Sequence, residues 1–500
     1  MKRYSEIWWL VGLLALTLFL RFYDLGARPY DHDEAIHGWF SVNILNGNQY
    51  RFDPVYHGPL LYYANALVFK LLGASDFYAR FLPALSSTAL VLLCFAMKRE
   101  LGRYGWIFAS SFMALSPSLT YYGRFLAHDD FVLFFTLAMV VLAVWLFRTR
   151  NSLFIYLLSL VMGLFICTKA CFYIHSAIFV SFLLLSLFMD SFHPAHPRDE
   201  VLERLKGIVA ANRIHVVLAS LLFVGIYCLF YSSFFANPYG VVQGVTGMLT
   251  YWGGQQANPR LPGPLYYYIP RLIFHEPAVY LAVPALIYVG LKKVKPMDTF
   301  LAFWTVCAFV IYSFAQEKVP WLVVHMVLPL AILAGRFTQT LWQRINARRI
   351  VALVLVLVMS WSLRENIWLC FDCPSLSPHL LKYMSTTKAA KETALEFRKI
   401  DPKRGQIFVT GDAMWVFTWY LRDREVTYLL PRGWQKTAIA VVADEKPLEG
   451  SEGFVRQVKD LRWWWLPDYR KLMTRDFFRY LIHHESTDPV GIARFSVYYR

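Results

Sequence analysis

Long apolar runs, separated by short polar segments, repeat along the first 370 residues of the chain. A helix needs roughly 20 apolar residues to cross the ~30 Å hydrocarbon layer of a bilayer, and about eleven runs approach that length. The pattern therefore predicts a polytopic α-helical membrane protein. We expect its spanning helices near residues 7–23, 81–99, 104–122, 131–148, 152–168, 172–190, 214–235, 277–292, 299–315, 320–336 and 349–367.

Positive charge alternates between successive loops. Lys and Arg residues gather before the first run and in every second loop after it, and the positive-inside rule assigns such loops to the cytoplasm. The N-terminus is then cytoplasmic, and an odd number of spans leaves the C-terminus outside. The loops expected on the outer face are 24–80, 123–130, 169–171, 236–276, 316–319 and the chain after 368.

Two of the outer loops are long. In loop 24–80, the helical spacing of apolar residues in 34–45 and 59–72 predicts helices that lie in the membrane interface. In an alternative interpretation, residues 59–73 form another membrane-spanning helix, but that would break the alternation of charge between loops. Loop 236–276 is rich in Gly, Pro and Tyr, which predicts an irregular lid or a re-entrant segment.

The composition becomes ordinary after about residue 385. A helix over 387–400, strands over 406–410 and 437–443, a helix over 467–483 and a last strand over 493–499 predict a small α/β domain. The predicted organisation is therefore a membrane domain at 1–370 and an extracytoplasmic α/β domain at 385–500. The cluster Arg462-Trp463-Trp464-Trp465 is either an interfacial anchor or a surface for sugar stacking.

Composition supports the membrane interpretation. The chain is 57% hydrophobic and 17% aromatic, with a mean hydropathy of +0.40, which is too apolar for a soluble protein. Because the net charge of +16 falls between apolar runs, it sets topology and does not indicate nucleic-acid binding. The first apolar run lacks a small-residue cleavage site, so we expect a retained anchor. For Cys370 and Cys373, three outcomes are open: a disulfide, a pair of metal ligands, or neither.

Two acidic groups fall on the expected outer face. One is Asp31, Asp33 and Glu34, and the other is Asp129 and Asp130 after His128. Ionised groups near lipid are costly and tend to mark function, so the two groups predict one site assembled from several loops. The alternative for Asp129 or Asp130 is that it caps the helix that follows.

Cations lie on the same expected face. Lys169 and Lys318 sit in loops too short to extend freely into water. Snorkelling to lipid headgroups explains one such lysine, whereas two of them with Arg80 and Arg124 favour an anion site. Lys318 alternatively pairs with Glu317.

Histidines 32, 37, 57 and 128 lie near these carboxylates. Together the two kinds of side chain could supply the ligands of a divalent metal. No fixed-spacing zinc motif, serine nucleophile elbow, phosphate-binding glycine loop or dinucleotide fingerprint is present in the sequence. No cofactor is required by the chemistry considered below.

Several short motifs combine with the two acidic groups. They are Asp33-Glu34 in a long first outer loop, Gly47, Tyr50, residues 59–62 (PLLY), 79–83 (ARFLP), and Tyr122-Gly123-Arg124 leading to Asp129-Asp130. With these motifs the chain resembles the GT-C superfamily of membrane glycosyltransferases, which includes protein O-mannosyltransferases and aminoarabinose transferases. Residues 31–35 and 317–321 resemble a bacterial and archaeal branch of this superfamily, whose members are labelled as associated with flippase activity.

The resemblance implies transfer of a sugar from a polyprenyl phosphate to an acceptor on the outer face of the cell membrane, with inversion at the anomeric carbon. It implies that Asp33 is the base or orienter of the acceptor hydroxyl, Glu34 its helper, Arg124 a phosphate contact, and Asp129 or Asp130 a second carboxylate. Physical reasoning adds Lys169, Lys318 and Arg80 at the donor phosphate. Secondary members of the site are Asp31, His37, His128 and Glu317.

Two other functions compete with the transferase. A carrier that flips lipid-linked sugars would hold ionisable groups at mid-membrane and often contain two related halves, whereas here the charges cluster at one face. A structural partner in an envelope-polymer complex would use the terminal domain. The sugar, the acceptor and the oligomeric state stay open, and protein mannosyltransferases do not match the terminal domain.

Overall fold

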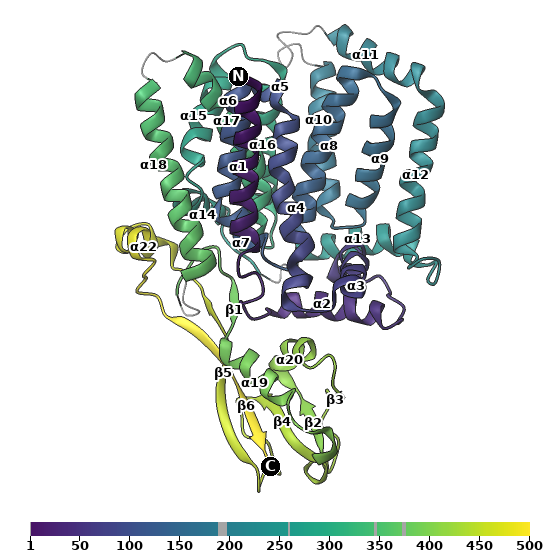
Figure 1. Cartoon of the computed structure of the whole chain (residues 1–500), viewed down its shortest axis with the longest axis vertical. Helices are drawn as coiled ribbons and strands as arrows, with labels where there is room; N and C mark the ends of the chain where they lie inside the picture. The colour runs from purple at the N-terminus through teal and green to yellow at the C-terminus, as the bar shows by residue number, and fades with distance from the viewer. Residues whose placement is uncertain (1, 189–197, 259–260, 345–347, 373–376) are drawn as a thin grey trace. The chain divides into compact units, whose positions relative to one another are not determined.

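The computed structural model describes the chain except residues 1, 189–197, 259–260, 345–347 and 373–376 (Figure 1). The chain forms two compact units. The first, called the helical unit, comprises Met1–Tyr23, Gln49–Leu61 and Phe81–Asp372. The second, called the mixed unit, comprises Asp24–Asn48, Tyr62–Arg80 and Cys373–Arg500. Cys373 lies outside the described residues, so its pairing with Cys370 stays open.

The helical unit is a bundle of long, apolar helices. Its elements, in chain order, are α1 (Lys2–Phe22), the short 3-10 helix η1 (Pro54–Tyr56), α4 (Asp76–Ala96, whose first turn belongs to the mixed unit), α5 (Lys98–Leu101), α6 (Arg103–Leu115), α7 (Pro117–Tyr122), α8 (Asp129–Thr149), α9 (Ser152–Ile166), α10 (Cys171–Phe188), α11 (Arg198–Ala211), α12 (Arg213–Tyr231), α13 (Gly240–Ala257), α14 (Tyr268–His275), α15 (Val279–Leu291), α16 (Pro296–Phe314), η3 (Pro320–Val323), α17 (Val324–Arg344), α18 (Arg348–Ile367) and the π-helical turn η4 (Trp368–Asp372).

Seven helices in the described residues are long and apolar enough to cross a membrane, which makes the chain a multi-pass membrane protein. They are Ser5–Phe22, Asp76–Ala96, Asp129–Thr149, Arg213–Tyr231, Pro296–Phe314, Pro320–Arg344 and Arg348–Phe371. The pair α14 and α15, bent by 112°, is an eighth candidate. The count of eleven therefore stays a prediction. The run 104–122 divides into α6 and α7 at Pro117, and α9 and α10 are shorter than the other spans.

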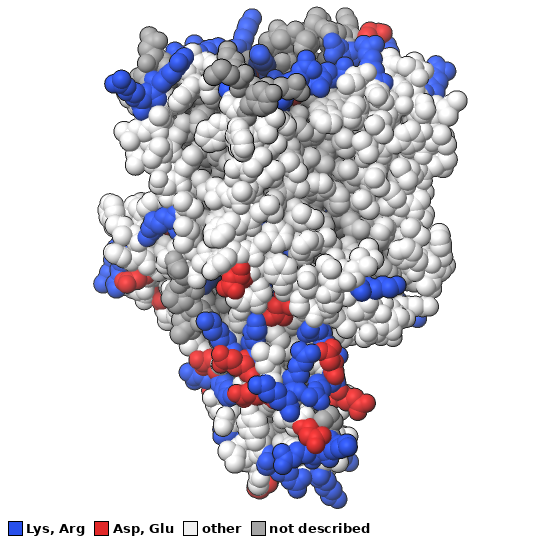
Figure 2. Space-filling view, in the orientation of Figure 1, with Lys and Arg blue, Asp and Glu red and all other residues white. Residues whose placement is uncertain are grey.

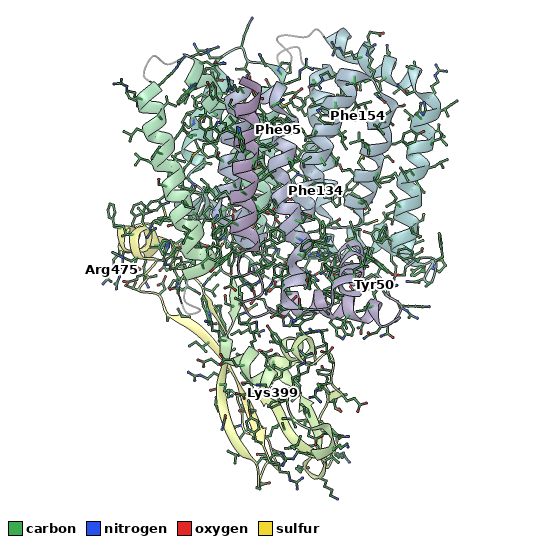
Figure 3. All side chains as sticks on the ribbon, in the orientation of Figure 1. Tyr50, Phe95, Phe134, Phe154, Lys399 and Arg475 are labelled. Carbon is green, nitrogen blue, oxygen red and sulfur yellow. The ribbon has the colours of Figure 1, made fainter. Side chains whose placement is uncertain are left out.

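Close packing holds the bundle together. Gly335 of α17 lies so near α6 that an added Cβ would stand 2.4 Å from the backbone nitrogen of Ala109. Aromatic side chains fill other gaps: Phe95 meets Trp106 edge-on at 5.0 Å between ring centroids, and Phe154 meets Trp145 at 5.4 Å (Figure 3). Small residues thus permit close helix contacts while rings fill the wider spaces.

The prediction of an irregular lid over 236–276 was wrong for much of its length, because α13 is an 18-residue helix. The alternative, a re-entrant segment, stays a prediction. Two glycines of α13 allow it to pack tightly. A Cβ on Gly240 would stand 2.0 Å from the carbonyl oxygen of Tyr231, and one on Gly244 would stand 2.5 Å from the Tyr227 hydroxyl. Glycine here marks close approach to α12 and not a turn, which composition alone does not distinguish.

The mixed unit is built on a six-stranded sheet. Its strands are β1 (Met384–Thr386), β2 (Gln406–Val409), β3 (Val426–Thr427), β4 (Ala438–Asp444), β5 (Val455–Trp465) and β6 (Val490–Tyr499), in the order β1-β5-β6-β4-β2-β3. Strand β2 pairs in parallel with β3 and β4, and the other pairs are antiparallel. Its helices are α2 (His32–Leu45), most of α3 (Leu60–Leu72), α19 (Lys388–Phe397), α20 (Met414–Tyr420), α21 (Tyr469–Leu472) and α22 (Phe477–His483).

Most elements expected in this unit are confirmed. The helical patterns over 34–45 and 59–72 correspond to α2 and α3, and the expected α/β segments correspond to α19, β2, β4 and β6. The helix expected over 467–483 divides into α21 and α22. The extracytoplasmic placement of residues 385–500 stays a prediction.

The tryptophan cluster lies in a strand that the sequence analysis did not predict. Trp463 and Trp465 of β5 are 1% and 4% exposed, so they belong to the interior of the mixed unit. Trp464 points the other way, and its indole lies over Gly491 of β6, with which it is paired. An interfacial anchor needs exposed rings, so that interpretation was wrong for Trp463 and Trp465.

Candidate functional site

The first acidic group opens helix α2. Asp31 is the N-cap residue, and the Glu34 side chain accepts a hydrogen bond from the Asp31 backbone nitrogen at 3.2 Å, forming a capping box. Successive helical residues point about 100° apart, so neighbouring carboxylates face different surroundings. Asp33 is exposed, whereas Glu34 is buried.

Glu34 is held by two arginines. Its carboxylate accepts hydrogen bonds from Nε and Nη2 of Arg80, both at 2.8 Å, and from Arg28 at 2.6 Å. Arg80 is fully buried and also donates to the backbone carbonyls of Leu25, Arg28 and Pro29. Arg80 therefore joins the first turn of α4 to the first turn of α2, and Glu34 is the centre of that contact.

Asp31 has partners on both sides. One carboxylate oxygen accepts from Arg28 at 2.8 Å and the other from the backbone nitrogen of Thr386 in β1 at 3.1 Å. Burial raises the pKa of Asp31 above its ordinary value, although Arg28 opposes the shift. Asp31 thus links α2 to the sheet.

Asp33 differs from both neighbours because its carboxylate faces solvent. The adjacent His32 ring meets the Trp415 ring edge-on at 6.2 Å, and burial lowers the pKa of His32 while Asp33 opposes that shift. His37, one turn further along α2, shares a hydrogen bond with the Tyr62 hydroxyl at 3.2 Å from Nδ1. Asp33 is therefore the carboxylate of this group that an external molecule can reach.

The second acidic group opens helix α8. Asp129 accepts hydrogen bonds from Nζ of Lys169 at 2.8 and 3.1 Å, and it pairs with Nε2 of His325 at 3.0 Å. All three side chains are buried. Burial alone would lower the pKa of Lys169, but the Asp129 carboxylate outweighs it and raises that pKa. Two basic groups thus converge on one carboxylate.

Asp130 faces a different set of residues. It is buried beside Ser87 and Arg21. The Ser87 hydroxyl donates to the Leu119 carbonyl at 3.2 Å and accepts from Nε of Arg21 at 2.8 Å. The Oδ1 atom of Asp130 has no hydrogen-bond partner among the described residues. The N-cap residue of α8 is His128, whose side chain makes no cap hydrogen bond. Both aspartates therefore have contacts that simple capping of α8 does not explain.

Arg124 and Lys318 stabilise the ends of helices. Arg124 donates to the backbone carbonyls of Leu20, Arg21 and Tyr23 at 2.7 to 3.2 Å, at the end of α1. Lys318 donates to the carbonyl of Ser313 at 2.5 Å and to that of Ala315, at the end of α16. Cations at helix C-termini offset the negative end of the helix dipole. Burial lowers the pKa of Lys318.

Two further site residues lie in loops of the helical unit. The ring of His128 makes a hydrogen bond from Nε2 to the Gly58 carbonyl at 3.2 Å and lies 5.2 Å from the His57 ring, centroid to centroid. Glu317 is half-buried in the turn before Lys318. The divalent metal proposed for these histidines stays a prediction.

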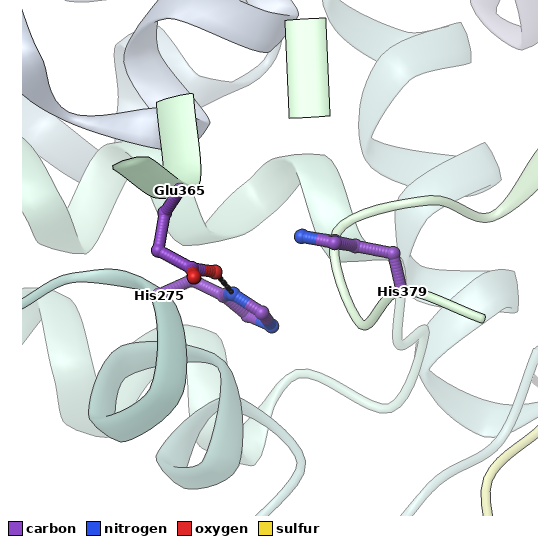
Figure 4. A group of neighbouring side chains, drawn as sticks. All are labelled: His275, Glu365 and His379. Atoms are coloured by element: carbon purple, nitrogen blue, oxygen red, sulfur yellow. Dashed lines mark hydrogen bonds and ion pairs between the residues drawn. The ribbon is translucent and has the colours of Figure 1, made fainter. Parts of the chain in front are cut away.

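The sequence analysis missed three buried ionisable residues, His325, Glu365 and Glu276. His325 lies 196 positions after its partner Asp129. Nδ1 of His275 is 2.9 Å from Glu365 (Figure 4), and Glu276 accepts hydrogen bonds from the Ser116 hydroxyl and the Ser118 nitrogen, each at 2.9 Å. Each is an ionisable residue within or beside an apolar run, which is the signal that could have identified it.

The structure therefore assembles two groups of candidate residues. The mixed unit brings together Asp31, Asp33, Glu34, His37 and Arg80, and the helical unit contains Arg124, His128, Asp129, Asp130, Lys169, Glu317 and Lys318. That the two groups face one common cavity stays a prediction. Each group alone combines carboxylates with cations, which suits proton transfer beside an anionic leaving group.

The helical arrangement defines a class: the chain has the fold of the GT-C membrane glycosyltransferases. ArnT from Cupriavidus metallidurans in the apo state is similar, with a TM-score of 0.61 and 15% identity over 84% of this chain and 85% of that chain. The same protein bound to undecaprenyl phosphate gives a TM-score of 0.60 at 17% identity over the same shares.

An archaeal oligosaccharyltransferase has the same fold. AglB from Archaeoglobus fulgidus, in complex with an inhibitory peptide and a dolichol-phosphate, gives a TM-score of 0.60 and 11% identity over 98% of this chain and 74% of that chain. No protein-family model matches the sequence, and no curated protein matches it either. At these identities the likeness establishes the fold, and activity must be argued from the residues.

Proposed function

We propose that the chain is an inverting glycosyltransferase that moves a sugar from a polyprenyl phosphate to an acceptor on the outer face of the cell membrane. The GT-C fold over most of the chain supports this assignment. Two proteins of that fold are described with a polyprenyl phosphate, undecaprenyl phosphate in ArnT and dolichol-phosphate in AglB. A lipid-borne donor suits an outward-facing enzyme because nucleotide sugars, made in the cytoplasm, do not cross lipid.

The observation that carries the proposal is the contrast between Asp33 and Glu34. Glu34 is buried and held by Arg28 and Arg80, whereas Asp33 is exposed on the same helical turn. A general base must reach its substrate, and a carboxylate already held by two guanidinium groups is a weak proton acceptor. Asp33 is therefore the base in this proposal, and Glu34 and Asp31 position the start of α2.

The donor phosphate requires cations. In the proposal, Lys169 and His325 supply positive charge beside Asp129, and Arg124 and Lys318 supply it at the ends of α1 and α16. Arg80 holds Glu34 and three backbone carbonyls, and in the proposal it positions the start of α2; its contact with the donor phosphate stays a prediction. Cations stabilise the charge that gathers on the departing phosphate.

The reaction proceeds by one displacement. The acceptor oxygen attacks the anomeric carbon from the side opposite the phosphate, and the proton of the acceptor passes to the Asp33 carboxylate. The bond between the anomeric carbon and the phosphate oxygen breaks, and its electron pair stays with the lipid phosphate. One displacement inverts the anomeric centre, and phosphate leaves without an acid. The scheme requires no metal.

The test is sugar transfer by membranes that contain the Asp33→Asn variant and a radiolabelled polyprenyl-phosphate sugar. We expect a loss of at least a hundredfold in transfer, the size typical of removing a general base. Glu449→Gln removes one exposed carboxylate elsewhere in the mixed unit and should transfer sugar normally. Unchanged transfer by well-expressed Asp33→Asn protein would exclude Asp33 as the base. Movement of the labelled lipid across the bilayer without transfer would favour the carrier.

A further inference from the structure

A cavity of about 670 Å³ lies in the helical unit, between the second half of α8, the middle of α9, the second half of α10 and the start of α16. Its wall is formed mainly by apolar side chains, among them Met139, Ala143 and Phe147 of α8, Met162 of α9, Phe182 of α10 and Phe300 of α16. Ligand-binding cavities commonly fall in this range of volume and are lined in this way.

The polar lining of this cavity is mostly cationic. Arg99, Arg148, Arg204 and Lys295 contribute four positive charges, and Glu100 contributes one negative charge. Glu100 is paired with Arg148 at 3.4 Å and therefore does not neutralise Arg99 or Lys295. Within the described part of the chain, neither Arg99 nor Lys295 forms an ion pair, and both are exposed. The cavity therefore offers charge complementary to an anion.

Charge and apolar surface are separated along the cavity. Arg148 lies in the last turn of α8 and Met139 nine residues earlier, which at 1.5 Å per residue is about 14 Å. The basic residue of α8 lies at one end of this length, whereas apolar side chains line all of it, from Met139 to Phe147. Figure 2 shows Lys and Arg gathered at the end of the helical unit where α11 lies. Such a division fits an amphiphile with an anionic head.

The cavity is distinct from the candidate active site. Asp129 opens α8 and Arg148 nearly closes it, so their Cα atoms are separated by about 28 Å of helix. The positive-inside rule predicts that the basic end faces the cytoplasm, where anionic lipids are concentrated. A ligand here would therefore enter from the leaflet opposite to the one in which sugar transfer is proposed.

We propose that this cavity binds an anionic glycerophospholipid, with its phosphate among Arg99, Arg148, Arg204 and Lys295 and one acyl chain along the face of α8. Free phosphate would leave the apolar wall unfilled, and a neutral lipid would leave Arg99 and Lys295 without a counter-charge. Basic pockets between membrane helices on the cytoplasmic side are a recurrent type of anionic-lipid site. The bound lipid links α8, α10 and α16 at their cytoplasmic ends.

The test is titration of the purified full chain, in a neutral detergent, with phosphatidylglycerol or phosphatidylcholine, with bound lipid counted by native mass spectrometry. We expect one phosphatidylglycerol to bind at least tenfold more tightly than phosphatidylcholine. Arg99→Gln with Lys295→Gln should weaken phosphatidylglycerol binding by about tenfold or more, since each surface cation contributes about fivefold. Ala143→Phe should also weaken it by filling the apolar part.

The matched control is Lys292→Gln with Lys293→Gln, which removes two exposed charges close in sequence that do not line the cavity. It should bind the lipid as the unaltered chain does. Equal weakening by this control, or equal binding of the two lipids, would mean that no specific site exists. Displacement by inorganic phosphate at the concentration of the lipid would also overturn the proposal. Because Arg99 and Lys295 are exposed, their variant should unfold thermally as the unaltered chain does.

Discussion

The guanidinium of Arg80 and the carboxylate of Glu34 form a two-point ion pair, with Nε to Oε1 and Nη2 to Oε2 both at 2.8 Å. Neither side chain is more than 2% exposed. A buried pair of this geometry fixes the direction of both elements that carry it. Here it fixes the first turn of α2, from which the neighbouring Asp33 faces solvent.

Replacing Arg80 with Met should destabilise the mixed unit strongly. The change leaves Glu34 buried with Arg28 as its remaining cation, and removing one partner of a buried pair costs about 3 to 5 kcal/mol. Thermal unfolding of the purified chain measures the effect. Arg462→Met is the matched control, because Arg462 pairs with Asp412 at the surface, where such pairs contribute about 0 to 1 kcal/mol. Equal losses from both variants would contradict the role assigned to Arg80.

Asp129 and Lys169 should show strong energetic coupling. Asp129→Asn leaves a buried lysine without its counter-charge, and Lys169→Met leaves a buried carboxylate with His325 alone. Each single variant should lose about 3 to 5 kcal/mol of unfolding free energy. The double variant should lose less than the sum, because neither charge is then left without its partner.

A double-mutant cycle measures this coupling. The comparison pair is Lys206 with Glu203. Each of these side chains is more than 60% exposed, so the pair should give a coupling energy near zero. Additive losses at Asp129 and Lys169 would show that the 2.8 Å contact contributes nothing specific to stability.

Hydrophobic runs and their flanking residues were enough to predict most of the helices. They identified α2 and α3 within the first long loop and strands β2, β4 and β6 of the terminal sheet. They failed at α13, where Gly240 and Gly244 serve helix packing, and at β5, whose tryptophans resemble an interfacial anchor. Both errors have one cause: a residue that permits or needs contact with a distant segment looks, in isolation, like a local turn or a surface signal.

The site was predictable in its charges but not in its pairings. Asp33, Glu34, Asp129 and Lys169 stand out because ionisable residues are rare beside apolar runs. Which carboxylate stays exposed depends on helix phase and on Arg80, 46 residues away from Glu34. The backbone carbonyls that hold Arg124 and Lys318 leave no trace in side-chain patterns.

Gly58 should be intolerant of a side chain because it lies against the loop that carries Lys169. Its backbone nitrogen donates to the Thr168 carbonyl at 2.9 Å, and an added Cβ would stand 2.3 Å from the Cys167 carbonyl oxygen. Since both atoms belong to backbone, Gly58→Ala must separate the two loops. We expect a loss of 1 to 3 kcal/mol, as for overpacking in a core, and a displaced Lys169.

The matched change for Gly58 is Gly225→Ala in α12, where an added Cβ meets no atom within 4 Å. Alanine there should leave stability unchanged or raise it by up to about 1 kcal/mol, since it favours the helix. Thermal unfolding of both variants decides the matter. A Gly58→Ala chain as stable as the Gly225→Ala chain would show that the loops separate without cost.

His32 should make the stability of the mixed unit depend on pH. Burial lowers the pKa of His32 below its ordinary value of 6.5, so the folded chain binds this proton less readily than the unfolded chain does. The stabilising contribution is therefore complete above pH 6.5 and is lost as the pH falls through the lowered pKa. Thermal unfolding between pH 8 and pH 5 should show a midpoint that decreases toward acid.

His32→Gln should flatten this dependence, because glutamine gains no charge in that range. The control is His483→Gln, since His483 is exposed and its replacement should leave the slope unchanged. Asp33→Asn should steepen the pH dependence of stability. Asp33 opposes the lowering of the His32 pKa, so its removal should make the chain less stable below pH 6.5. If Asp33→Asn left the slope unaltered while His32→Gln flattened it, the carboxylate would be too well solvated to influence its neighbour.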